Sequence, residues 1–351
     1  MTVRSTWSKS EVLRQKVDLC TIIPHDWQTY GVDESAAGVP EGFRRLPCVF
    51  PGRIHFHFHR GVGRFLDEFR PDLVHLDQEP YSIVTFRWAM ACRRRRIPYL
   101  VFTWQNIFKR YPVPFRWMEK WVLSHAAGLV CGNSESVEVF RRKGYRGPIW
   151  TIPQFGVEEP ETSWPPRENR KLRVGFVGRL VEEKGVSDLI AALSPVSGSE
   201  LVLIGDGDDR EALLSRARAL PGKDRVDFLG PMHSEKVREA IGTLDVLVLP
   251  SRTRSNWKEQ FGRVLVEAMA EGVAVIGSSS GAIPEVVGEA GLIFEEGNVE
   301  ALTDAIQKMA DPAIRASYGS AGRARFRKLY TQEQVCERYA EAYRQILSHA
   351  D

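Results

Sequence analysis

The chain has 351 residues, of which 43% are apolar and 26% charged, and its formal net charge is +3. A single hydrophobic core seldom supports this length, so we expect two domains, and the composition excludes a disordered or collagen-like chain. No apolar run approaches the roughly eighteen residues of a membrane span, residues 1–10 lack the pattern of a signal peptide, and five scattered cysteines show no metal-ligand spacing. A cytoplasmic protein with reduced thiols is therefore expected.

Short apolar strands alternate with helical stretches along the chain, which indicates parallel sheets covered by helices on both faces. The first half has candidate strands at residues 17–23, 73–76, 99–103, 129–131 and 149–152. The second half has them at residues 173–177, 201–204, 226–228, 246–249, 273–276 and 291–294.

A proline-rich and charged stretch separates the two halves. It covers residues 158–170, whose composition continues neither helix nor strand, and we interpret it as a linker. The predicted organisation is thus a first domain over residues 1–157, this linker, a second domain over 171–330, and a final helix over 331–351.

Two glutamates eight positions apart lie in the most informative stretch of the chain. Glu259 and Glu267 flank the predicted start of a helix near Phe261. Free peptide N–H groups at a helix start suit a phosphate or sugar hydroxyls, and a carboxylate can stabilise positive charge at an anomeric carbon. Such spacing also occurs in solvated helices, so its surroundings decide the interpretation.

A second candidate binding segment follows the predicted strand 173–177. There Gly178 allows a ligand to approach the backbone, while Arg179 and Lys184 offer a planar guanidinium and a mobile ammonium to a diphosphate. The alternative is that both cations are solvated loop residues.

Six blocks occur in a fixed order between residues 173 and 286. They are Gly-Arg-Leu-x-x-x-Lys-Gly at 178–185, then the segments 201–207, 226–230, 245–251, 259–267 and 281–286. With these blocks the chain resembles the retaining nucleotide-sugar glycosyltransferases of family 4, also called group 1.

The resemblance implies a fold, a chemistry and roles for individual residues. The fold is α/β of the GT-B type, with two Rossmann-like, doubly wound parallel-sheet domains facing a cleft. No metal and no cofactor beyond the nucleotide-sugar donor are expected. Glu259 would act on the donor sugar as a catalytic residue. The residues expected to bind the donor are Gly178, Arg179, Lys184, Phe228, Phe261, Gly262 and Glu267.

The first domain departs from the family pattern. The family begins with a strand and a glycine-rich turn, whereas the first clear strand here, 17–23, follows only a short helical stretch, so the first strand is predicted to be absent. By resemblance, the helix over 331–351 would cross back onto this domain.

A carboxylate-rich loop after the strand 73–76 takes the place of the histidine that the family often has before Glu-Pro. Ligands of open α/β sheets bind at the carboxyl ends of strands, so we select Glu79 as a second candidate catalytic residue, ahead of Asp77. A loop-capping carboxylate is the alternative. His75, within the strand, is expected to be structural.

Aromatic and amide side chains end the strand 99–103. Trp104, Gln105 and Asn106 are suited to stack on and bond to a sugar acceptor, although Trp104 also fits plain packing.

Histidines alternate with phenylalanines over residues 55–59, which would place His55, His57 and His59 on one strand face. No nearby ligand completes a metal site, so none is predicted.

Basic residues are concentrated in the first half of the chain. Residues 1–160 hold 23 lysines and arginines against 16 acids, with clusters at 93–96 and 141–143 and a basic, aromatic loop at 109–117. This charge suits peripheral contact with an anionic membrane, and a solvated surface is the alternative. No nucleic-acid motif accompanies it.

The sequence therefore predicts a hexosyltransferase that takes its sugar from a nucleotide-sugar donor and passes it to a glycan, lipid-linked or small-molecule acceptor. A nucleotide-sugar epimerase of the same architecture and a catalytically silent partner subunit are the alternatives. A glycan phosphorylase would need a lysine for pyridoxal phosphate, for which no distinct signal is present.

Overall fold

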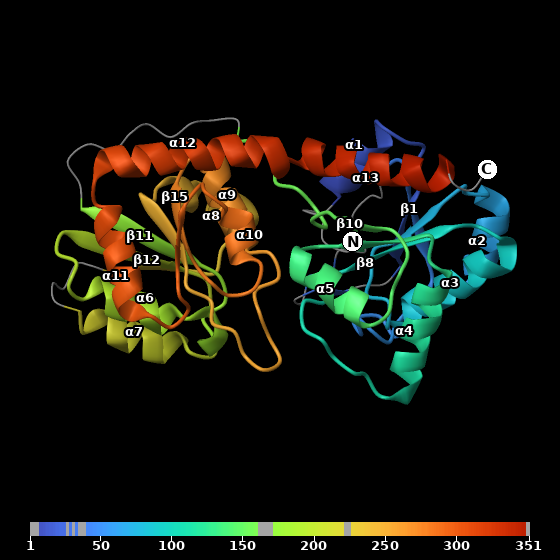
Figure 1. The fold of residues 1–351 in the computed structure, drawn as a ribbon, viewed down its shortest axis with the longest axis horizontal. Coiled ribbons are helices and arrows are strands. Elements are labelled where there is room, and N and C mark those ends of the chain that lie inside the picture. Colours follow the sequence, from blue (N-terminus) through green and yellow to red (C-terminus); the bar gives the residue numbers. More distant parts are fainter. Residues whose placement is uncertain are drawn as a thin grey trace. The chain divides into compact units, whose positions relative to one another are not determined.

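The computed structural model describes residues 7–25, 28–29, 32–33, 40–160, 171–220 and 226–348. The chain divides into two compact units (Figure 1): unit 1 comprises Met1–Gly156 and Gln332–Asp351, and unit 2 comprises Val157–Thr331. Most of the predicted linker, residues 161–170, lies outside the described residues. No helix in the described ranges is long and apolar enough to cross a membrane.

Unit 2 is built on one six-stranded parallel sheet with the order β13-β12-β11-β14-β15-β16. Its strands are β11 Leu172–Val177, β12 Ser199–Ile204, β13 Val226–Gly230, β14 Val246–Leu249, β15 Ala274–Ser278 and β16 Leu292–Phe294. Numbered within the unit, the order is 3-2-1-4-5-6, the doubly wound dinucleotide-binding topology. The chain reverses its winding between β11 and β14, which are direct neighbours.

Helices cover this sheet, and the neighbouring strands β14 and β15 are buried along their whole length. Their continuous apolar sequence reflects burial on both faces. The helices are η3 Glu182–Lys184, α6 Val186–Leu193, α7 Arg210–Arg218, α8 Ser234–Gly242, α9 Arg263–Glu271, α10 Ile283–Val287, α11 Val299–Lys308 and α12 Pro312–Leu329.

Unit 1 holds a four-stranded parallel sheet with the order β10-β9-β8-β7. Its strands are β7 Val74–Leu76, β8 Tyr99–Thr103, β9 Gly128–Cys131 and β10 Ile149–Thr151. A separate parallel pair joins β1 Thr21–Pro24 to β4 Phe43–Leu46, so the strand predicted at 17–23 begins later. Two short antiparallel pairs join β2 Gln28–Thr29 to β3 Val32–Asp33, and β5 Cys48–Val49 to β6 Phe58–His59.

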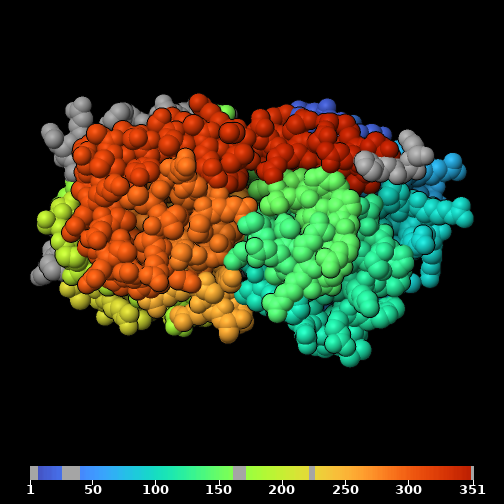
Figure 2. Space-filling view, viewed as in Figure 1, coloured from blue at the N-terminus to red at the C-terminus, as the bar shows by residue number. Residues whose placement is uncertain are grey.

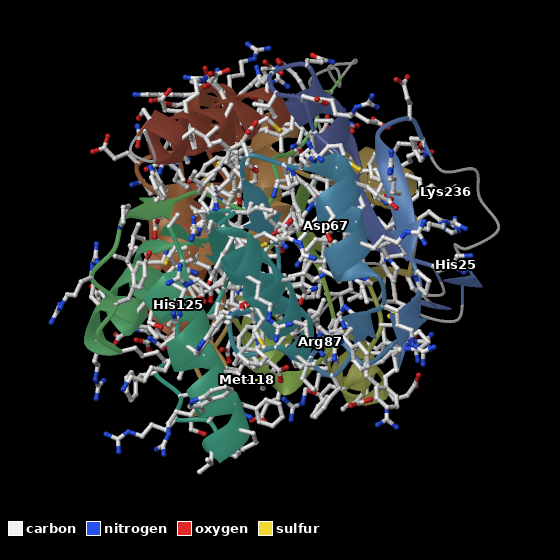
Figure 3. The ribbon with its side chains drawn as sticks, turned by 90° about the vertical axis from the view of Figure 1, so that its right-hand side faces the viewer. His25, Asp67, Arg87, Met118, His125 and Lys236 are labelled. Atoms are coloured by element: carbon white, nitrogen blue, oxygen red, sulfur yellow. The ribbon has the colours of Figure 1, made fainter. Side chains whose placement is uncertain are left out.

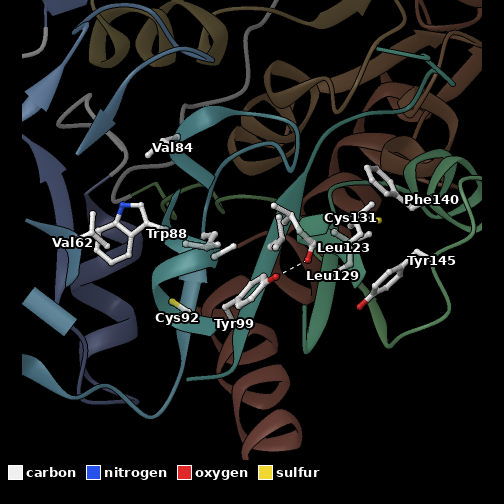
Figure 4. Close-up of a cluster of buried hydrophobic side chains, with 14 of the residues drawn as sticks. Val62, Val84, Trp88, Cys92, Tyr99, Leu123, Leu129, Cys131, Phe140 and Tyr145 are labelled. Carbon is white, nitrogen blue, oxygen red and sulfur yellow. Dashed lines mark hydrogen bonds between the residues drawn. The ribbon is translucent and has the colours of Figure 1, made fainter. Parts of the chain in front are cut away.

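The core of unit 1 lies between its sheet and the helices α2 Val62–Phe69, α3 Ile83–Arg95, α4 Val113–His125 and α5 Ser134–Arg142. Figure 4 shows part of this cluster, in which the buried Tyr99 hydroxyl donates to the carbonyl of Val122 over 2.7 Å. This bond satisfies the phenol and ties β8 to α4.

A second apolar cluster fixes the C-terminal helix α13 Gln332–Ser348 to unit 1. Val335, Tyr339 and Tyr343 lie one turn apart on its inner face, where they are buried. The N-terminal helix α1 Ser8–Arg14 packs against α13, and Leu13 joins the same cluster. Residues far apart in sequence thus complete one unit.

Candidate functional site

The candidate donor site of unit 2 lies at the carboxyl ends of β11 and β14, where the winding of the sheet reverses. Backbones approach each other closely here. A Cβ atom on Gly205 would lie 1.9 Å from the carbonyl oxygen of Gly178, and one on Gly185 would lie 2.0 Å from that of Pro250. Only glycine fits these two positions, and crevices at such a reversal are the usual ligand sites of open α/β sheets.

Glu259 is held by two side chains that enter from different loops. Its Oε2 atom lies 2.6 Å from the Nζ atom of Lys184 and accepts a 2.9 Å hydrogen bond from the hydroxyl of Ser251. Glu259 is 8% exposed, and the Lys184 ammonium also lies 4.9 Å from the ring centroid of Trp257. The structure thus joins Lys184, predicted for the diphosphate, to Glu259, predicted for the sugar.

The backbone of Glu259 is fixed by the turn that precedes α10. The amide of Ala282 donates to the Glu259 carbonyl over 3.0 Å. A Cβ atom on Gly281 would lie 2.1 Å from that same oxygen, and Gly281 has a φ of +54°. The sequence block at 281–286 therefore fixes the backbone position of Glu259.

Helix α9 begins at Arg263, two residues later than the predicted start near Phe261. Gly262 is its N-cap in the left-handed conformation, with a φ of 74°. The Phe261 side chain is buried and lies edge-on to Tyr330, so only backbone of this residue is available at the helix start. A helix that starts at Gly262 still places the positive end of its dipole here, which favours an anion.

Glu267 lies in the second turn of α9, where Arg263 donates to its Oε1 atom over 2.8 Å. Burial raises the pKa of Glu267, although the neighbouring Arg263 acts in the opposite direction. Its carboxylate is therefore an acceptor held in one orientation, as binding of ribose hydroxyls would require.

The other predicted donor residues differ in how far they are fixed. Arg179 has a side chain that is 66% exposed, with a 3.3 Å ion pair to Glu183. Phe228 lies on β13 beneath the guanidinium of Arg210, 4.9 Å from the ring centroid. Sequence reasoning did not single out Arg252. Its Nε and Nη2 atoms donate to the two carboxylate oxygens of Asp188, which ties the loop after β14 to α6.

In unit 1, Glu79 lies at the carboxyl end of the sheet and accepts two hydrogen bonds from the end of β8. The Thr103 hydroxyl donates to Oε2 over 2.7 Å, and the Trp104 amide donates to Oε1 over 2.8 Å. Burial nevertheless raises the pKa of Glu79 to about 6. This value lies near neutral pH, which suits a group that exchanges a proton.

Asp77, the alternative to Glu79, has a structural ion pair. Lys9, whose side chain is buried, lies 3.2 Å from its Oδ2 atom, and Gln154 donates to Oδ1 over 3.0 Å. Gln154 in turn accepts a 2.9 Å hydrogen bond from the indole of Trp104. Neither Lys9 nor Gln154 was among the predicted residues, because their importance depends on contacts across unit 1.

The predicted acceptor residues Gln105 and Asn106 are both buried, and their amides have protein partners. Gln105 accepts from Lys143 over 2.9 Å, and Asn106 donates to Glu135 over 3.1 Å. Trp104 packs its ring over Gly132, where a Cβ atom would lie 2.0 Å from the ring. Within unit 1 these side chains therefore support the end of β8.

The three alternating histidines do not share one strand face, contrary to the prediction. Strand β6 contains only Phe58–His59, and His57 bonds instead to the carbonyls of Arg53 and Ile54. His59 accepts from the indole of Trp88 over 3.0 Å, and burial lowers its pKa to about 4. Among the described residues, no group of three histidine, cysteine, aspartate or glutamate side chains is placed to hold a metal ion.

Solved structures share the fold of this chain. HepE of Anabaena, solved with UDP, superposes with a TM-score of 0.70 at 20% identity, with 82% of each chain covered. The sucrose-phosphate synthase of Thermosynechococcus elongatus gives a TM-score of 0.64 at 22% identity, covering 88% of this chain and 84% of that one. The chain has the α/β GT-B fold, as its sequence predicted.

Two family models match consecutive parts of the sequence. The model described as "Glycosyl transferase 4-like domain" matches residues 7–153, and "Glycosyl transferases group 1" matches residues 159–325. The chain belongs to the group 1 glycosyltransferase family, which confirms the resemblance seen in its sequence.

The two curated relatives described next align with this chain over about half of each sequence. An N-acetyl-alpha-D-glucosaminyl L-malate synthase of Bacillus anthracis is 33% identical over 51% of this chain and 47% of its own. A GDP-mannose-dependent monoacylated alpha-(1-6)-phosphatidylinositol monomannoside mannosyltransferase of Corynebacterium glutamicum is 34% identical over 46% of this chain and 44% of its own. The chain thus spans about half the length of these relatives.

Proposed function

We propose that this protein is a retaining glycosyltransferase that moves a hexose-type sugar from a nucleotide-sugar donor to a glycan, lipid-linked or small-molecule acceptor. The observation that carries the proposal is the buried Glu259 carboxylate, fixed by Lys184 and Ser251 at the reversal point of the unit 2 sheet. Family membership and the names of the relatives, which include a GDP-mannose-dependent enzyme and a UDP complex, support it.

The donor binds to unit 2 in this proposal. Arg179, Lys184 and the positive end of α9 would neutralise the diphosphate, and Glu267 would accept hydrogen bonds from the ribose. Glu259 would orient the sugar and stabilise positive charge as it develops at the anomeric carbon. Lys184 would then be shared between the carboxylate and the diphosphate.

Transfer with retention follows if the acceptor attacks on the face from which the diphosphate leaves. The bond between the anomeric carbon and the diphosphate oxygen breaks, the acceptor oxygen bonds to the same carbon, and the departing oxygen takes the acceptor proton. No covalent sugar-enzyme intermediate is required. Unit 1 would hold the acceptor, with Glu79 and the Trp104 ring as its proposed contacts.

A donor screen tests the proposal first. A ligand present at one hundred times its dissociation constant stabilises a protein by about 2.7 kcal/mol, which a thermal shift detects. Among UDP-, GDP-, ADP- and dTDP-sugars, we expect one nucleotide series to raise the unfolding temperature. The shift should be lost in Arg179→Ala and kept in the matched variant Arg216→Ala, which changes an exposed arginine on α7.

The donor identified in this way separates the alternatives. A transferase converts it only when an acceptor is added, apart from slow hydrolysis. An epimerase converts the sugar without any second substrate, and a silent partner subunit binds the donor without turnover. Conversion to a new nucleotide sugar without an acceptor would refute the proposal.

A further inference from the structure

Large apolar side chains are exposed in one region of unit 1. Five of the six that are exposed in the described part of the chain come from two segments, 50–56 and 113–117. They are Phe50 at 54%, Ile54 at 55%, Phe56 at 49%, Val113 at 69% and Trp117 at 57% exposed. Exposed apolar groups that gather in one patch mark a surface that is covered in use.

The two segments form one surface, although they are far apart in sequence. The rings of Phe56 and Phe115 meet edge to face with their centroids 5.6 Å apart. Tyr81 provides a second link between the two segments. Its ring centroid lies 4.9 Å from that of His55 in the first segment and 4.2 Å from that of Tyr111, which comes two residues before the second segment. We call the five exposed apolar side chains of the preceding paragraph, together with the exposed cations of segments 50–60 and 107–120, the apolar-basic surface.

Helix α4 presents a regular pattern to this surface. Val113, Arg116, Trp117 and Lys120 are exposed and follow the spacing of one helix face. The opposite face, which includes Met118 and Val122, is buried in unit 1. In Figures 1 and 2, α4 lies at the lower edge of unit 1.

The charge of the apolar-basic surface has one sign. Segments 50–60 and 107–120 carry six exposed cations, namely Arg53, Arg60, Lys109, Arg110, Arg116 and Lys120. Their single acid, Glu119, is buried in an ion pair with Lys143. Arg87 on α3, labelled near Met118 in Figure 3, adds a further exposed cation and lies 4.3 Å over the ring of Phe58.

Three residues of the basic clusters 93–96 and 141–143 have partners within unit 1. Lys143 is buried against Glu119, and Arg141 donates to the carbonyls of Tyr145 and Gly147. Arg95 donates to the two carboxylate oxygens of Asp67 from its Nε and Nη2 atoms. These three residues stabilise unit 1, whereas the six cations named for the apolar-basic surface are exposed.

We propose that the apolar-basic surface docks unit 1 onto an anionic lipid membrane. Tryptophan, phenylalanine and isoleucine suit the boundary between headgroups and acyl chains, while lysine and arginine beside them attract acidic headgroups. A second copy of the chain fits less well, because a symmetric contact would place cations against cations. The proposal extends the proposed function, since a lipid-linked acceptor would lie in the same membrane, but its test needs no sugar transfer.

Vesicle co-sedimentation of the full chain tests the inference. We expect binding to vesicles of phosphatidylcholine and phosphatidylglycerol in equal parts, and at least about tenfold weaker binding to pure phosphatidylcholine. Binding to the acidic vesicles should weaken further as salt is raised. Absence of binding to the acidic vesicles would overturn the proposal.

Two pairs of substitutions separate the apolar and the basic contribution. Ile54→Ser with Val113→Ser should weaken binding about tenfold, because both side chains would otherwise be buried in the lipid. Arg116→Glu with Lys120→Glu should weaken it by at least about 25-fold, at about fivefold for each cation lost. The matched controls in unit 2 are Ile293→Ser and the pair Arg216→Glu with Arg218→Glu, all exposed and expected to bind as wild type.

Other occupants give different results. If charge reversal abolishes binding but the serine pair leaves it unchanged, the surface binds an acidic polymer and the lipid proposal fails. If the wild-type chain sediments as a dimer that the serine pair dissociates, the surface joins two copies, and the proposal fails as well. Unchanged unfolding temperatures would show that the variants are folded.

Discussion

Lys184 and Glu259 form a 2.6 Å ion pair although 75 positions separate them in the sequence. Lys184 ends the short helix after β11, and Glu259 lies between β14 and α9. The pair therefore lies beyond the carboxyl ends of β11 and β14, the two central strands of unit 2. Because both side chains are largely buried, removal of one partner leaves the other with an unpaired charge.

Glu259→Gln should lower kcat by about 10²- to 10³-fold, the usual loss when one preorganised electrostatic contact to a transition state is removed. Affinity for the free nucleotide should change little, because the free nucleotide lacks the transferred sugar that Glu259 contacts. Transfer kinetics and nucleotide titration measure the two quantities. Glu300→Gln, an exposed site on α11, is the control. A kcat equal to that of wild type would refute the role of Glu259.

Gly281→Ala should destabilise the protein more than Gly297→Ala. Both glycines have a left-handed φ, of +54° and +80°, so each substitution carries the strain of about 1–2 kcal/mol for that conformation. Only at Gly281 does the added Cβ meet backbone, 2.1 Å from the Glu259 oxygen, whereas nothing lies within 4 Å at Gly297.

The excess at Gly281 should be at least about 1–3 kcal/mol, as for other overpacked sites, and urea titration of both variants measures it. An equal loss of stability in the two variants would show that the turn before α10 accommodates the added Cβ without strain. The same shift of the Glu259 backbone should lower transfer activity in Gly281→Ala alone.

The sequence predicted unit 2 well because local signals and tertiary structure agree there. Each apolar run became a strand, and the glycines at 178, 185 and 281 mark positions where backbones meet. The start of α9 was placed two residues early, because a glycine N-cap such as Gly262 leaves no side-chain signal.

Unit 1 was harder to predict because its contacts cross the chain. No motif marks Lys9, yet it is buried between Asp77 and the ring of Tyr339, whose centroid lies 4.1 Å from its ammonium. Alternation at residues 55–59 indicated a strand, but bonds from His57 to nearby carbonyls favour a turn instead.

Lys9→Met and Asp77→Asn should each destabilise the protein by about 3–5 kcal/mol, because each leaves a buried charge unpaired. The double variant should lose clearly less than the sum of the two. Urea titration of all four proteins gives the coupling energy. The exposed pair Arg64–Glu68 is the comparison, and its cycle should give a much smaller coupling energy. Additive losses at Lys9 and Asp77 would show that the pair is not coupled.

Glu79 should make the stability of the protein depend on pH between about 4.5 and 6. Burial raises the pKa of its carboxyl from an ordinary 4.5 to about 6, so the folded protein holds this proton where the unfolded chain has released it. The associated stability is fully present below pH 4.5 and is lost as pH rises through 6. The shift corresponds to about 2 kcal/mol.

The variant Glu79→Gln carries no titrating group at this site and can still accept from the Trp104 amide. The stability of wild type relative to this variant should therefore fall by about 2 kcal/mol between pH 4.5 and pH 7. Asp77→Asn should show the opposite sign. Burial alone would raise the pKa of Asp77, but Lys9 holds it below its ordinary 3.8, so wild-type stability is lost as the solution becomes more acidic. Urea titrations between pH 4.5 and pH 7 measure the difference for Glu79, and titrations below pH 3.8 measure that for Asp77. A difference for Glu79 that does not change with pH would show that its carboxyl ionises equally in both states, and Glu79 would then have no claim to a proton-exchanging role near neutral pH.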